Sequence, residues 1–152
     1  MSKENASLIK YFLFLLISSI GSVIILTIFP FGGWIISDQW SSTNYRIYLF
    51  ESLIIPLSIV LFIIIILFIF STVLSLMSLN NLTYLNPLKH YKIGRLFTVI
   101  SVISIVGLLI FLIVMGLGSN SWYIGVSFYE GLSSSVLNLV LYTIIIRKIK
   151  KK

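Results

Sequence analysis

Four long, mostly apolar runs with very few charged residues fill most of this 152-residue chain. A helix needs about 20 mostly apolar residues to cross the hydrocarbon core of a bilayer. We predict membrane spans at residues 8–29, 47–78, 96–117 and 122–146. The short segments that remain leave no room for a soluble domain. Residues 1–152 are therefore expected to form one all-α transmembrane domain, an antiparallel bundle of four helices.

The composition favours a membrane protein over a soluble one. Apolar residues make up 59% of the chain and charged residues only 10%, whereas a typical soluble domain is about 25% charged. The chain has no Cys and a single His, so it offers neither a thiolate site nor a His pair for haem. We expect no metal, no cofactor and no catalytic residue, and no enzymatic activity unless the chain is part of a larger enzyme.

The basic residues indicate how the spans are oriented. All but one flank the first span, lie between the second and third, or follow the fourth: Lys3, Lys10, Lys89, Lys92, Arg95, Arg147, Lys148, Lys150, Lys151 and Lys152. Only Arg46 lies on the other side. The positive-inside rule then predicts cytoplasmic termini and two outer loops. The net charge of +7 suits anionic lipid headgroups of the cell membrane, and we expect no nucleic-acid binding.

The aromatic residues agree with this topology. Trp34, Trp40 and Trp122 all fall where the outer interface is predicted. Tryptophan gathers at membrane–water interfaces, where its amphipathic ring lies among the headgroups. We therefore assign these three residues to the outer interface.

Small and polar residues recur at helical spacing within the spans. Helices in lipid associate through close contacts at small residues and through hydrogen bonds, because lipid is as apolar as the helices. The clearest set places Ser127, Gly131, Ser134 and Asn138 on one face of the fourth span. Shorter sets pair Ser18 with Ser22 and Ser101 with Ser104. These sets indicate either helix packing or a polar conduit.

Two acidic residues, Glu51 and Glu130, fall within apolar runs. A charged carboxylate at a helix centre costs about 3 kcal/mol on insertion scales, so such residues normally face protein or water. If the fourth helix starts at Trp122, Glu130 lies about 12 Å along it. With Arg46, Ser127, Ser134 and Asn138, the two acids form a candidate ion site or a buried polar site. In the second case Arg46 pairs with a glutamate, or a protonated glutamate bonds a hydroxyl.

Several features resemble the claudin and peripheral-myelin-protein type of tetraspan. They are the four spans with both ends inside and the residues Gly33, Trp34, Arg46, Tyr123, Gly125, Ser127, Tyr129 and Gly131. The resemblance implies a non-enzymatic protein that works through lateral association in the membrane. In that family the first outer loop is longer, folds as a small sheet and often carries a Cys pair. Residues 30–45 are few and lack Cys, which argues against a sheet here and against the family's cell-contact or barrier role.

Three functions remain open at this point. The first is a structural, adhesion or accessory subunit that binds further copies of the chain or other membrane proteins. The second is a small ion-coupled or proton-coupled transporter or channel that uses Glu51 and Glu130. The third is an accessory subunit of a membrane redox complex.

Overall fold

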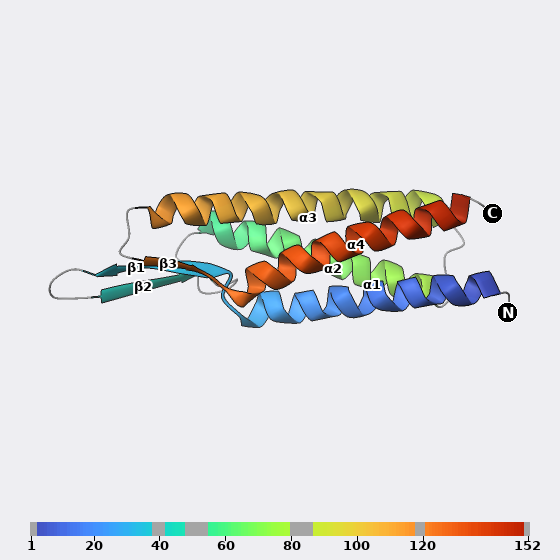
Figure 1. The fold of residues 1–152 in the computed structure, drawn as a ribbon, viewed down its shortest axis with the longest axis horizontal. Helices are drawn as coiled ribbons and strands as arrows, with labels where there is room; N and C mark the ends of the chain where they lie inside the picture. Colours follow the sequence, from blue (N-terminus) through green and yellow to red (C-terminus); the bar gives the residue numbers. More distant parts are fainter. Residues whose placement is uncertain (1–2, 38–41, 48–54, 80–86, 118–120, 151–152) are drawn as a thin grey trace.

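A computed structural model describes residues 3–37, 42–47, 55–79, 87–117 and 121–150 of the chain. The elements along the chain are α1 (Lys3–Ile28), β1 (Gly32–Ser37), β2 (Ser42–Ile47), α2 (Ile55–Leu79), α3 (Pro87–Gly116), β3 (Ser121–Ile124) and α4 (Val126–Lys150) (Figure 1). All four helices are long and apolar enough to cross a membrane. The prediction of a largely helical, multi-pass membrane protein is thereby confirmed at that level.

The four helices lie alongside one another. Helix α1 packs against α2 and α4, and α3 packs against α4 and α2, with the α2–α3 contact the smallest of these four. Both chain termini lie at one end of the helices, and the strands lie at the other end (Figure 1). Helices suit this chain because each one satisfies its own backbone hydrogen bonds, which lipid cannot do.

Exposed and buried side chains are distributed in the opposite way to those of a soluble protein. Large apolar side chains such as Phe14, Ile17 and Ile103 are 60% or more exposed. Small polar side chains, among them Ser19, Ser75 and Ser135, are fully buried between the helices. Lipid favours this arrangement, because it solvates apolar surface and leaves polar groups to pair inside the protein.

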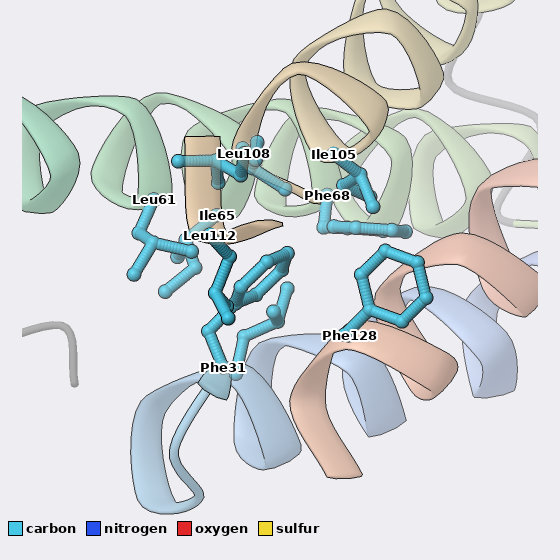
Figure 2. Close-up of a cluster of buried hydrophobic side chains, with 10 residues drawn as sticks. Phe31, Leu61, Ile65, Phe68, Ile105, Leu108, Leu112 and Phe128 are labelled. Carbon is cyan, nitrogen blue, oxygen red and sulfur yellow. The ribbon is translucent and has the colours of Figure 1, made fainter. Parts of the chain in front are cut away.

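An apolar cluster fills the bundle at the end nearest the strands. Figure 2 shows Phe31, which follows α1, directed toward Phe128 of α4. Their rings meet edge to face, with centroids 5.5 Å apart and planes at 86°, a preferred geometry for aromatic pairs. Side chains of α2 and α3 complete the cluster, so all four helices contribute to it.

A three-stranded antiparallel sheet at this end was not expected from the sequence. Its strand order is β2-β1-β3, and Trp34 of β1 stands opposite Tyr45 of β2 and Trp122 of β3. The prediction that the short segment 30–45 forms no sheet is therefore wrong. A hairpin needs only two short strands, and the third strand comes from residues assigned to the fourth span.

The helix boundaries differ from the predicted ones in several places. Helix α1 begins at Lys3, before the predicted start at 8, and Ile47, the predicted start of the second span, is the last residue of strand β2. Helix α4 begins at Val126, because Trp122 belongs to strand β3 and not to the helix. Helix α3 begins at Pro87, nine residues before the predicted start at 96. Its first turns carry Lys89, Lys92 and Arg95, since basic residues end the apolar part of a span without ending the helix.

Candidate functional site

Glu130 lies near the strand end of the bundle, in the second turn of α4. Because the helix starts at Val126, Glu130 lies only about 6 Å along it at 1.5 Å per residue. The predicted distance of about 12 Å was counted along a helix starting at Trp122, and the later helix start corrects it. Its Oε1 atom accepts a hydrogen bond of 2.7 Å from Ser134, one turn further along the same helix. The side chain is half-buried, so the carboxyl group lies at the boundary between bundle and lipid.

Ser22 of α1 makes the second contact to this carboxyl group. Its Oγ lies 3.4 Å from Glu130 Oε1 and 2.8 Å from the backbone oxygen of Ser18. A hydroxyl has one proton to donate, and the shorter contact is the stronger hydrogen bond. Ser134 is therefore the main donor to Glu130, and Ser22 brings α1 close to the carboxyl group without holding it firmly.

Ser127 joins the start of α4 to the end of α1. Its Oγ lies 2.9 Å from the backbone oxygen of Ile25 and 2.7 Å from that of Phe29. The Ile25 carbonyl also accepts the Phe29 N–H over 2.9 Å, whereas the Phe29 carbonyl, just past the end of α1, has no donor within the helix. Ser127 supplies one from a neighbouring helix, so this predicted site residue has a structural contact.

Replacing Ser127 with alanine is expected to lower the free energy of unfolding by about 1 kcal/mol, because the Phe29 carbonyl loses a part-buried hydrogen bond between two helices. The measurement is unfolding in mixed micelles, followed by circular dichroism. Ser133→Ala is the matched control, because the Ser133 hydroxyl is exposed and bonds only carbonyls of its own helix. A loss as large in the control as in Ser127→Ala would contradict this role.

Asn138 makes the next contact between α4 and α1, two turns beyond Glu130. Its Nδ2 donates to Ser19 Oγ over 3.1 Å, and the side chain is only 1% exposed. Within the described part of the chain, its Oδ1 has no hydrogen-bond partner, and neither do the buried hydroxyls of Ser18 and Ser135. Asn138 therefore links two helices and leaves one acceptor unused.

Two tyrosine pairs continue the polar contacts toward the end that carries the termini. Tyr142 of α4 donates to Ser71 of α2 over 2.9 Å. Tyr91 of α3 and Ser78 of α2 bring their hydroxyl oxygens to 2.6 Å. Neither tyrosine was among the predicted site residues. Tyr142 follows Asn138 by four residues, so extending the fourth-span pattern by one turn would have identified it.

The other predicted packing residues differ in their burial and in their contacts with other helices. Gly131 is buried, and a Cβ atom there would lie 3.3 Å from Ile105 of α3 and 3.5 Å from Leu26 of α1. Ser101 is buried and donates to the Phe97 carbonyl of its own helix, while Ser104 is half-buried. Gly131 therefore allows close approach of three helices, whereas the α3 serines make no hydrogen bond to another helix among the described contacts.

For several predicted site residues, the structure does not describe where the side chain lies relative to Glu130. Glu51 and Trp40 lie outside the described residues. Arg46 lies opposite Gly33 in the sheet, and Trp34 is on the central strand, but the side chains of both are outside the described part. Trp122 is 41% exposed, and its side chain lies over Gly116 at the end of α3.

A shallow, wide-open depression of about 810 Å³, called the α4 groove below, lies along the exposed face of α4 and is lined by this helix alone. It contains Glu130 as its one charged residue among apolar and small neighbours: Val126, Tyr129, Leu132, Ser133, Val136, Leu137 and Val140. These positions recur every three or four residues, which is the spacing of one helix face. Glu130 thus has hydrogen bonds to the bundle on one side and an apolar groove on the other.

Within the described ranges, no three His, Cys, Asp or Glu residues come together to hold a metal. Comparison with protein-family models, curated proteins and solved structures gives no match. The function is therefore inferred from the chemistry of the chain's own residues.

Proposed function

We propose that this chain is a non-enzymatic tetraspan membrane protein that acts as a structural, adhesion or accessory subunit. The observation that carries the proposal is that polar side chains inside the bundle form hydrogen bonds between helices. Ser127, Asn138 and Tyr142 each bond a residue of another helix. Such bonds contribute about 0.6–2 kcal/mol each in a membrane. These bonds explain the row of polar residues on one face of α4 as helix packing. The outer surface of the helices is then available to partner proteins.

The proposed topology is an antiparallel bundle with cytoplasmic termini in the cell membrane. Its support is that the basic residues of the helices cluster at the end that carries the termini, including the last turn of α4. There the Lys148 ammonium group lies 5.0 Å from the centre of the Tyr11 ring. Anionic headgroups of the cytoplasmic leaflet would bind this basic end. The sheet then faces outward and agrees with the claudin-type resemblance, which implies a sheet in that position.

A second candidate function is an ion or proton path through the bundle. The observation in its favour is the set of unpartnered buried oxygens on Asn138, Ser135 and Ser18. Asn138 and Ser135 are three residues apart on α4, and Ser18 is next to the serine that Asn138 contacts. Buried oxygens without donors would accept bonds from water or coordinate a cation. A path would connect them to Glu130.

One preparation tests both candidates. The full chain is purified in a mild detergent, and its mass is measured by native mass spectrometry and light scattering. We expect a second membrane protein in fixed ratio with the 17.3 kDa chain. In proteoliposomes with a pH or sodium gradient, the chain alone should give no flux above that of empty vesicles. The accessory role would be overturned by a chain that purifies alone and carries flux that Asn138→Leu abolishes without loss of helical signal.

A further inference from the structure

The α4 groove is a shallow helix face that is long enough to contact one more helix. From Val126 to Val140 it spans about 21 Å at 1.5 Å per residue, most of the roughly 30 Å of a bilayer core. Tyr129 is 59% exposed at one end, and Val140 is 50% exposed at the other. Ser133 lies between them and turns its hydroxyl to the Tyr129 carbonyl of its own helix, 2.7 Å away. A small residue in such a face lets a second helix approach closely.

Glu130 gives this groove a charge preference. Among the described side chains, which do not include that of Arg46, none forms an ion pair with it, and the donors described for its carboxyl group act on the Oε1 atom alone. An acid at the border of protein and lipid is stabilised by a cation, because the surrounding medium screens charge poorly. An apolar groove with a single carboxylate therefore matches an apolar helix with a single basic residue at the same depth.

A second copy of the chain does not supply that residue from its helices. The basic residues of the described helices are Lys3, Lys10, Lys89, Lys92, Arg95, Arg147, Lys148 and Lys150. They lie in the first turns of α1 and α3 and in the last turn of α4, and these helix ends are at the end of the bundle that carries the termini (Figure 1). A parallel copy would bring these side chains to the wrong end of the groove. We infer that the α4 groove binds a transmembrane helix of another protein that carries one Lys or Arg at the depth of Glu130.

This inference rests on the proposed accessory function and specifies the chemistry of the partner. It is tested with model peptides and the full chain in lipid vesicles of phosphatidylcholine with phosphatidylglycerol. Three Leu-Ala transmembrane peptides are compared: one with a Lys at the depth of Glu130, one with the Lys near the opposite interface, and one with Leu in its place. Energy transfer between a labelled chain and a labelled peptide measures association.

We expect the peptide with Lys at the depth of Glu130 to associate about tenfold more tightly than the other two. Glu130→Gln should remove this preference, and Ser133→Leu should weaken binding by filling the groove. Gly107→Leu is the matched control, because a Cβ atom at Gly107 meets nothing within 4 Å and the residue faces outward on α3. Since the peptide series leaves the protein unchanged, the comparison does not depend on how a variant folds.

Four results would overturn the inference. Equal association of the three peptides would remove the charge preference. Tighter association of the Lys peptide with an Arg46→Gln variant would show that Glu130 pairs with Arg46 of its own chain. Energy transfer between two labelled copies that requires Glu130 would assign the groove to self-association, and loss of peptide binding on adding phosphatidylethanolamine would assign it to a lipid amine. If a partner still co-purifies in any of these cases, only this inference fails and the proposed function stands.

Discussion

Gly125→Ala is expected to lower the free energy of unfolding by about 3 kcal/mol or more, which is at the severe end for a single substitution. Gly125 separates β3 from α4, and its N–H donates to the Phe31 carbonyl over 2.9 Å. A Cβ atom here would collide with the Pro30 carbonyl oxygen and would lie within 3.0 Å of other backbone atoms of residues 30 and 31. Backbone atoms cannot rotate away as a side chain does, so the end of α1 and the start of α4 must separate.

The measurement is the unfolding midpoint and free energy in mixed micelles, with circular dichroism for the helices and tryptophan fluorescence for the sheet. Gly21→Ala and Gly107→Ala are the controls, because an added Cβ atom meets nothing within 4 Å at either position. Alanine also has the higher helix propensity, so both controls should equal or exceed the wild type in stability. A loss in Gly125→Ala no larger than in the controls would show that this junction does not limit stability.

Gly94→Ala is expected to cost about 2–3 kcal/mol for a different reason. A Cβ atom at this position of α3 would lie 2.5–2.8 Å from three atoms of the Tyr142 side chain. Tyr142 is fully buried and donates to Ser71, so its ring cannot move aside without losing that hydrogen bond. Overpacking of this kind costs about 1–3 kcal/mol, and a broken buried hydrogen bond adds about 1 kcal/mol.

A double-mutant cycle separates this clash from a general effect of alanine. In a Tyr142→Leu background the ring is absent, so Gly94→Ala should cost little. In a Tyr142→Phe background the ring carbons remain, and most of the cost of Gly94→Ala should persist. Coupling energies between residues in contact are about 0.5–3 kcal/mol. Additive effects of Gly94→Ala and Tyr142→Leu would contradict the contact between α3 and α4.

The helices could be predicted from the sequence because length and apolar composition are local properties. A span needs about 20 apolar residues, and four helices among the described residues qualify. The pattern of Ser127, Gly131, Ser134 and Asn138 likewise predicted a common face, and all four residues are buried on α4. Their partners on other helices could not be derived from spacing alone, because periodicity along one helix contains no information about its neighbours.

The sheet and the position of Glu130 along its helix could not be predicted from the sequence, for one shared reason. Trp122 and Tyr123 begin an apolar run that continues into α4, and a short strand followed by a helix has no distinct composition there. The strand is defined by its pairing with β1, whose residues lie some 90 positions earlier in the chain. Such a nonlocal pairing leaves only a weak local signal. Gly125, between strand and helix, was the one local indication of a break.

The pairing of β1 has a consequence for the order in which the chain assembles during synthesis. Until residues 121–124 have been made, β1 lacks β3 and pairs along one edge only, with β2. The Phe29 carbonyl likewise has no Ser127 to bond. The first three helices therefore enter the membrane before their sheet end can close. Insertion of α4 is the step that completes the sheet end. Before that step, the growing chain presents an open β-edge to other proteins at the membrane.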